Sequence, residues 1–398
     1  MKISPEDIYN SPNKLASHYS KFKVSKKLLF TGHSHQAWPD CGFTGQKKAW
    51  EDAAEFVDDK WEKAFEKADE VKQGFSKLLN DKSGYITLAS NTHEHLIKFL
   101  SALPLKTKPK LITSDGEFHT IRRQLDRLGE EGIEIAKVSS SPVDEVVGKL
   151  ISKCDDSTSA VIVSSVFFQS GLILPHLSEL AEHCINNNIE LLIDTYHHLN
   201  VVPFSIKENK LENAFIIGGG YKYCQLGEGN CFLRIPKDCK LRPVITGWYS
   251  EFTALADKKK PGEVIYGTGG DLFAGATYDP TSHYRAAEVF NFYNEMKLTP
   301  EFLREVSQHQ VSLLAEEFDA LNLDDNIITR DRNVDIKNVG GFLVLKSETA
   351  GTISQKLKES GVLTDYRGSS LRLGPAPYIS DSQIKEAIKI LGKVAADL

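Results

Sequence analysis

Two short stretches decide the fold: residues 190–194 read ELLID, and residues 214–222 read AFIIGGGYK. Each opens with an apolar run that is typical of a strand buried on both faces, and each ends in polar or glycine residues. Similar runs lie upstream at 110–113, 133–138 and 160–165, separated by amphipathic stretches at 120–130, 143–153 and 177–187. Buried strands joined by helices form a parallel sheet with helices on both sides. We therefore predict an α/β large domain with a mostly parallel sheet covered by helices.

The rest of the chain reads differently. A charged amphipathic stretch at 53–79 predicts one long helix ahead of the sheet. After residue 280, the pattern predicts helices at 284–296 and 301–321, a strand at 342–345, a helix at 352–360, a strand at 371–373 and a helix at 381–396. We expect an N-terminal segment (1–45) that packs on the small domain, a large cofactor-binding domain (46–280) and a small C-terminal α/β domain (281–398). A chain of 398 residues suits this division, because single cores stop growing near ~250–300 residues.

Composition argues against several classes of partner. The formal net charge is −6, and the longest basic run is Lys258-Lys259-Lys260, which we interpret as a solvated loop. Binding of nucleic acid is therefore not expected. The six cysteines contain no CxxC pair, so no metal site is predicted. No apolar run approaches the ~20 residues that span a bilayer, and the N-terminus lacks the apolar core of a signal peptide. We expect a soluble cytoplasmic protein.

Polar groups follow the predicted strands at one edge of the sheet, where open parallel sheets bind ligands. Asp194 ends one strand, Lys222 follows three glycines after the next, and Ser90-Asn91-Thr92 begin a helix near residue 93. The set supplies an amine, a carboxylate and an anion-binding helix start. Pyridoxal phosphate (PLP) needs all three: an amine for its aldehyde, a carboxylate for its ring nitrogen and an anion site for its phosphate. We expect the glycines to let the backbone approach this cofactor closely.

Five segments resemble a known family: LLFTGHSHQAWP (28–39), YITLASNTHEHL (85–96), ELLIDTYHHLN (190–200), GGGYKYCQLGEGNCFL (218–233) with TGW (246–248), and TDYRGSSLRLGPAPY (364–378). They resemble the class-V enzymes of the fold-type-I PLP-dependent transferase fold, and kynureninase in particular. The resemblance covers residues 28–395. It implies a PLP cofactor, a homodimer, and hydrolytic cleavage of the Cβ–Cγ bond of an L-amino acid, as in the conversion of kynurenine to anthranilate and L-alanine.

The resemblance also assigns roles. Lys222 corresponds to the lysine that attaches the cofactor, Asp194 to the partner of the ring nitrogen, and His197 to a neighbour of the ring hydroxyl. The remaining assignments are Ser90, Asn91, Thr92 and Tyr221 at the phosphate, Phe118 (or its rival His119) stacked on the ring, Trp248 and Thr277 reaching the phosphate from the second subunit, and Arg372 at the substrate carboxylate with Ser34 nearby.

Two departures leave the substrate open. Glu251 and Thr277 occupy positions where kynureninases have a histidine and an asparagine that face the substrate's aromatic ring. A class-V aminotransferase would use the same Lys222, Asp194 and Arg372, and so would other PLP lyases. A cysteine desulfurase needs a nucleophilic cysteine before the last strand, and residues 350–372 contain none. A catalytically inactive PLP-fold binding protein is the remaining alternative.

Overall fold

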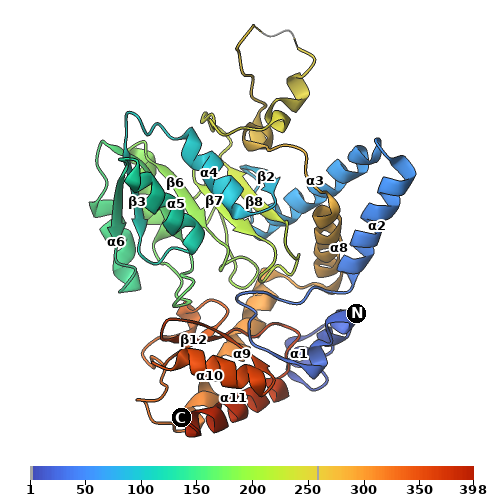
Figure 1. Cartoon of the computed structure of the whole chain (residues 1–398), viewed down its shortest axis with the longest axis vertical. Helices are drawn as coiled ribbons and strands as arrows, with labels where there is room; N and C mark the ends of the chain where they lie inside the picture. The colour runs from blue at the N-terminus through green and yellow to red at the C-terminus, as the bar shows by residue number, and fades with distance from the viewer. Residues whose placement is uncertain (1–2, 258–259) are drawn as a thin grey trace.

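The computed structural model describes residues 3–257 and 260–398. Its centre is a seven-stranded sheet in the order β2-β8-β7-β6-β5-β3-β4 (Figure 1). The strands are β2 (Tyr85–Ala89), β3 (Lys110–Ser114), β4 (Glu134–Val138), β5 (Thr158–Ser164), β6 (Glu190–Asp194), β7 (Phe215–Gly219) and β8 (Cys231–Ile235). The pairs from β7 to β4 are parallel, whereas β8 runs antiparallel to both β7 and β2. The predicted α/β class with a mostly parallel sheet is confirmed.

Helices cover both faces of this sheet because its strands are apolar on both sides. Ile162 of β5 packs in the cluster that contains Leu96 of α4 (Thr92–Ala102) and Leu125 of α5 (His119–Glu130). The alternate residue Val163 packs in the cluster on the opposite face, with α6 (Val146–Ser152) and α7 (Leu177–Asn186). Neighbouring residues of one strand thus bury against different helix layers, as the near-continuous apolar runs predict.

Two predictions about the elements were wrong in detail. The long helix expected at 53–79 is two helices, α2 (Cys41–Phe56) and α3 (Lys60–Leu78). The chain turns between them at Val57, whose φ of 49° is incompatible with a continuing right-handed helix. The strands β2 and β8 were not predicted as members of the sheet, because Thr87 and Arg234 interrupt their apolar runs. Their antiparallel pairing extends the sheet beyond β7.

The smaller domain lies below the sheet domain in Figure 1. It contains α9 (Pro300–Ala320), β9 (Leu343–Lys346), α10 (Ala350–Glu359), β11 (Asp365–Arg367), β12 (Ser370–Leu373) and α11 (Asp381–Ala396), with β11, β12 and β9 forming an antiparallel sheet. The helix α8 (Thr281–Met296) packs along α2 and α3, so its contacts are with the large domain. Short 3₁₀ segments lie at Leu15–Phe22, Val24–Lys26, Val143–Glu145, Trp248–Ala254, Gly269–Phe273 and Ile336–Asn338.

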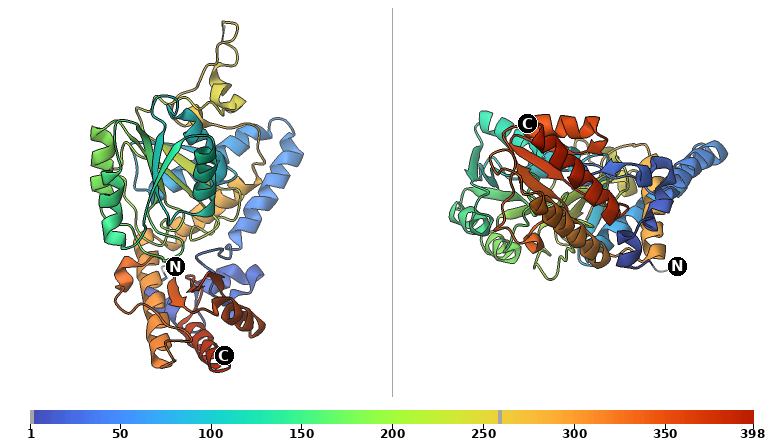
Figure 2. Two further views of the ribbon diagram at one scale, coloured as in Figure 1. Left: turned by 60° about the vertical axis from the view of Figure 1, so that its left-hand side comes forward. Right: turned by 90° about the horizontal axis from the view of Figure 1, so that it is seen from below.

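The N-terminal segment lies against the small domain, and both termini are at that end of the molecule (Figure 2). Its strand β1 (Leu28–Leu29) pairs in parallel with β10 (Val362–Leu363). The helix α1 (Pro5–Tyr9) places the ring of Tyr9 in a stack on His309 of α9, with 3.7 Å between the ring centroids. The segment then crosses to the large domain, where the backbone N–H of Gln36 donates to the carbonyl of Tyr221.

Within residues 3–257 and 260–398, no helix combines the length and the apolar character needed to cross a membrane. Two residues of the basic run that was expected to be a solvated loop, Lys258 and Lys259, lie outside the described residues.

Candidate active site

A cavity of about 280 Å³ opens at the carboxyl ends of β5, β6 and β7. It brings together most of the residues that the sequence singled out: Ser90, Asn91, Thr92, Phe118, Asp194, His197, Tyr221 and Lys222. They come from four separate segments of the chain. The strand order places these segments side by side, because parallel strands present all their carboxyl ends at one edge.

Lys222 lies on the floor of this cavity with a side chain that is almost fully removed from water. Its Nζ is 2.6 Å from Nε2 of His197 and faces the ring of Phe118 at 5.4 Å from the centroid. Burial lowers the pKa of Lys222 to about 7, although the nearby carboxylate of Asp194 raises it in part. A large share of this amine is therefore neutral near pH 7, and a neutral amine is the nucleophilic form.

Asp194 ends β6 and points into the same cavity. One carboxylate oxygen, Oδ1, accepts a hydrogen bond of 2.8 Å from the backbone N–H of Tyr196. Burial raises the pKa of Asp194, whereas that hydrogen bond and the charge of Lys222 oppose the rise. The carboxylate has room for a second donor, which a protonated ring nitrogen would supply.

His197 contributes an unused hydrogen-bonding atom. Its Nε2 faces Lys222, but its Nδ1 is buried and has no partner among the described residues. Burial, reinforced by the charge of Lys222, lowers the pKa of His197 well below its ordinary value, so the ring is neutral. Unpaired buried polar atoms are costly, and a polar group of a bound ligand would satisfy this one.

The wall opposite Lys222 is the start of α4. Asn91 is the N-cap of this helix, and its Oδ1 accepts from the backbone N–H of Glu94 at 3.0 Å. Ser90 and Thr92 flank the cap and line the cavity. Backbone N–H groups at a helix start, flanked by hydroxyls, form a suitable site for a phosphate.

The glycines before Lys222 serve packing within the chain. A methyl group on Gly219 would clash with the hydroxyl of Tyr196, and one on Gly218 would come within 2.7 Å of the ring of Phe232. The glycines thus pack against other side chains of this chain, and their predicted role in letting the backbone approach the cofactor stays a prediction. They let the β7 loop lie directly against the loop that follows β6.

Arg372, predicted to bind a substrate carboxylate, does not line this cavity. Its guanidinium is buried and makes a two-point ion pair with Asp365, with Nε–Oδ1 and Nη2–Oδ2 distances of 2.9 and 2.6 Å. Its Nη1 also donates to the carbonyl of Phe168, whose side chain lines the cavity. Arg372 was predicted from the sequence as a site residue, whereas Asp365, in the same segment TDYRGSSLRLGPAPY (364–378), was not.

His33 is the third member of this ion pair and was also missed. Its fully buried ring places Nε2 at 2.7 Å from Oδ1 of Asp365. Burial lowers the pKa of His33 to about 4, despite the nearby carboxylate, so the neutral ring donates from Nε2. Burial opposes ionisation of Asp365, but His33 and Arg372 hold the pKa of this carboxyl below its usual value. Its place beside Ser34, in a segment that the sequence had already singled out, was the available signal.

Three other predicted residues lie away from Lys222 in this chain. The Oγ of Ser34 contacts Nδ1 of His35, whose ring stacks on Tyr221. Trp248 is 44% exposed and begins the 3₁₀ turn Trp248–Ala254. This turn belongs to the segment, yellow in Figure 1, that projects from the large domain. Thr277 lines an adjacent cavity of about 470 Å³ that shares Ser90 with the first one.

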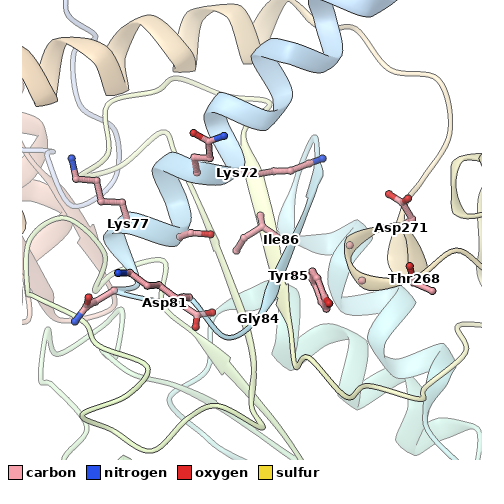
Figure 3. Close-up of a pocket in the computed structure, with 14 residues that line it drawn as sticks. Lys72, Lys77, Asp81, Gly84, Tyr85, Ile86, Thr268 and Asp271 are labelled. Atoms are coloured by element: carbon pink, nitrogen blue, oxygen red, sulfur yellow. The ribbon is translucent and has the colours of Figure 1, made fainter. Parts of the chain in front are cut away.

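A roomier hollow of about 620 Å³ lies at the β2 edge of the sheet (Figure 3). Two of its charged residues are engaged by others: Lys72 binds Asp69 at 2.9 Å, and Asp81 binds the buried Arg234 at 2.8 Å. It contains no group comparable with the buried amine of Lys222. Among residues 3–257 and 260–398, no set of three or more His, Cys, Asp and Glu side chains could hold a metal ion.

Comparisons with known proteins agree with this geometry. Residues 303–391 match the family model described as the kynureninase C-terminal domain. Kynureninase from Bacillus cereus (strain ATCC 10987 / NRS 248) is 24% identical over 328 residues, which cover 77% of this chain and 72% of that protein. An uncharacterized aminotransferase from Bacillus subtilis (strain 168) is 19% identical, covering 82% of this chain and 84% of its own length.

A solved structure of the cystine C–S lyase C-DES, a variant with glycine linked to its PLP cofactor, superimposes with a TM-score of 0.81 at 15% identity. The match covers 94% of this chain and 98% of that one. The chain therefore has the fold of fold-type-I PLP enzymes, and the resemblance to kynureninase is confirmed. PLP is the cofactor of this class. The relatives have three different activities, so they do not fix the reaction.

Removing Asp365 tests the ion pair of Arg372. We expect Asp365→Asn to cost about 3 kcal/mol of unfolding free energy at pH 7, because it leaves a buried guanidinium without its counter-charge. The stabilisation by a carboxylate of lowered pKa is complete above its unfolded pKa, near ~4, and is lost as the pH falls further. The difference in unfolding free energy between the wild type and Asp365→Asn, measured by urea unfolding, should therefore narrow below about pH 4. The control Asp331→Asn, at an exposed site, should cost less than about 0.5 kcal/mol. A cost that small for Asp365→Asn would contradict a buried ion pair.

Proposed function

We propose that this protein is a PLP-dependent enzyme that acts on an L-amino acid and cleaves its Cβ–Cγ bond hydrolytically, as kynureninases do. One observation carries the proposal: the buried amine of Lys222 shares a cavity with the carboxylate of Asp194 and the start of α4. When bound, PLP supplies an electron sink that stabilises negative charge on the substrate carbon. Everything else in the reaction depends on groups of the chain.

Four groups would hold the cofactor. Lys222 would attach it through Nζ, since a neutral amine is available near pH 7. Asp194 would keep the ring nitrogen protonated through a charge-assisted hydrogen bond. The N–H groups at the start of α4, with Ser90, Asn91, Thr92 and Tyr221, would bind the phosphate. His197 would meet a polar ring substituent with its unpaired Nδ1.

The side chain that stacks on the cofactor ring would be Phe118. It lines the cavity and faces Nζ of Lys222, which supports it over its rival His119. His119, on the first turn of α5, is not among the residues that line the cavity.

Arg372 would bind the substrate carboxylate. The pair with Asp365 uses Nε and Nη2, and Nη1 is bonded to Phe168, so the guanidinium is held rigidly with one hydrogen each left on Nη1 and Nη2. A carboxylate approaching end-on could accept both. Ser34, beside His33, would lie near the same substrate. An aminotransferase would need the same contacts, and it remains the second candidate on the strength of the Bacillus subtilis relative.

The active assembly would be a homodimer. Apolar side chains are exposed around the projecting segment, including Val244 at 80% and Trp248 at 44%, and a second copy of the chain would cover them. Trp248 and Thr277 do not reach Lys222 within one chain. In a dimer they would contact the phosphate bound by the partner.

Attachment through Lys222 has a defined pH dependence. The rate at which the protein captures PLP should rise with pH up to about 7 and then level off, because the amine is neutral above its lowered pKa. Borohydride reduction followed by peptide mass spectrometry should locate the cofactor on Lys222. The Lys222→Ala variant should capture none, whereas Lys207→Ala, at an exposed lysine, should behave like the wild type. Attachment to another lysine would refute this assignment.

The reaction type is tested by its products. Incubation with kynurenine, 3-hydroxykynurenine and other γ-keto amino acids should release L-alanine from at least one of them. Transamination without alanine would move the protein to the aminotransferase class, and a PLP-loaded protein that turns over no amino acid would favour an inactive binding protein.

Arg372→Lys should weaken amino-acid binding by about 1–3 kcal/mol while leaving bound PLP in place, because one of two charge-assisted bonds is lost.

Shared sites in a dimer can be tested by mixing two defective variants. Lys222→Ala and Thr277→Ala should each have little activity alone. A mixed dimer should regain activity, since one of its two sites then combines the intact Lys222 of one subunit with the intact Thr277 of the other. An active monomer in sedimentation, or no recovery after subunit exchange, would show that Thr277 does not serve the partner's site.

A further inference from the structure

A second buried carboxyl lies beneath the cavity. Glu117 is 2% exposed in the turn between β3 and α5, next to Phe118. Its Oε1 is 2.6 Å from the hydroxyl of Ser114, and its Oε2 is 2.6 Å from the hydroxyl of Ser164. In the described part of the chain, no Lys, Arg or His forms an ion pair with it. The roles assigned above do not use this carboxyl.

The hydrogen bonds around Glu117 have a direction. The hydroxyl oxygen of Ser114 accepts from the backbone N–H of Gly116 at 3.2 Å, so its own hydrogen is free to be donated to Oε1. If Oε2 of Glu117 carries a proton, it donates to Ser164. The hydrogen of Ser164 is then free to point elsewhere.

Asp194 is the neighbour of Ser164 on the adjacent strand. Ser164 ends β5 and Asp194 ends β6, and the two residues are paired in register on parallel strands. Paired residues of parallel strands project from the same face of a sheet. Both line the cavity that contains Lys222. When Glu117 is protonated, the hydroxyl of Ser164 can therefore donate to the carboxylate of Asp194.

The local charges favour a proton on Glu117. Burial raises the pKa of Glu117 to about 7, and the charge of Asp194 adds to the rise, whereas the hydroxyls of Ser114 and Ser164 oppose it. Asp194 has the cation Lys222 nearby, and His197 beyond it is neutral. Two carboxyls in one buried site favour a single negative charge, and the one without a cation keeps the proton.

We propose that Glu117, Ser164 and Asp194 form a hydrogen-bond relay in which Glu117 holds a proton and Ser164 directs its hydroxyl to the ionised Asp194. Glu117 is a positioning residue, because it acts on the cofactor site through Ser164. Only the role of the relay, which is to keep Asp194 charged for the ring nitrogen of PLP, rests on the proposed function. Its hydrogen bonds exist in the chain alone, so they can be tested without cofactor.

Infrared difference spectroscopy can detect the proton directly in the full-length, cofactor-free protein. At pH 6 the wild type should show the carbonyl stretch of a protonated carboxylic acid, and Glu117→Gln should lack it. The glutamine amide can still donate to Ser164 and accept from Ser114, so this variant should fold. Glu130→Gln, at an exposed carboxyl at the end of α5, is the matched control and should leave the band unchanged. A wild type without this band at pH 6 would overturn the proposal.

Two further variants test the connection to Asp194 and do not depend on Glu117→Gln. Asp194→Asn should lower the pH at which the acid band disappears by about one unit, because it removes a neighbouring negative charge. Ser164→Ala should shift the band's frequency, because the acceptor of the Glu117 proton is gone. A band that neither variant changes would identify an isolated buried acid and overturn the relay. The proposed enzyme activity could fail separately, in the product assays.

Thermal unfolding gives an independent readout. A buried acid of raised pKa stabilises the fold at low pH, and that stabilisation declines between its unfolded pKa, near ~4.3, and its folded pKa, about 7. As the pH rises through this window, the unfolding midpoint of the wild type should therefore fall by a few degrees relative to that of Glu117→Gln. Above the window, the difference between the two midpoints should stay constant. A difference that is constant with pH would count against a proton on Glu117.

Discussion

The burial of the Lys222 amine is the constraint around which the large domain is arranged. Moving an ammonium group out of water is unfavourable, so it persists only with a counter-charge or as the neutral amine. Asp194 supplies the counter-charge, and burial promotes the neutral amine. Both groups lie at strand ends because the parallel order of β5, β6 and β7 brings those ends together. The glycines of β7 let the loop of Lys222 lie against Tyr196, which closes one side of the cavity.

A second charged group, Arg372, ties the parts of the chain together at this cavity. It lies on β12 of the small domain, bonds to Phe168 of the large domain, and shares Asp365 with His33 of the N-terminal segment. Each partner comes from a different part of the chain. The position of the small domain relative to Lys222 is therefore linked to a buried charge network, and a substrate carboxylate would bind at the point where the three parts meet.

Much of this arrangement could be predicted from the sequence, and the reasons for the failures are physical. The runs that became β3, β5 and β6 are apolar on both faces, so their pattern identifies them without a structure. Asp194 and Lys222 follow directly from the ends of such runs. The break at Val57 depends on a single backbone angle that side-chain periodicity does not encode. Asp365 and Glu117 were missed because each is also bound by a residue distant in sequence, His33 and Ser164 respectively, and pairing between distant segments leaves no local pattern.

If Lys222 and Asp194 form one cofactor site, a crystal structure of the protein loaded with PLP will show both at the same cofactor molecule. We expect density that is continuous between the cofactor and Nζ of Lys222, with the ring nitrogen within hydrogen-bonding distance of the Asp194 carboxylate and the phosphate at the start of α4. A cofactor bound elsewhere, or one in this cavity whose ring nitrogen points away from Asp194, would contradict it.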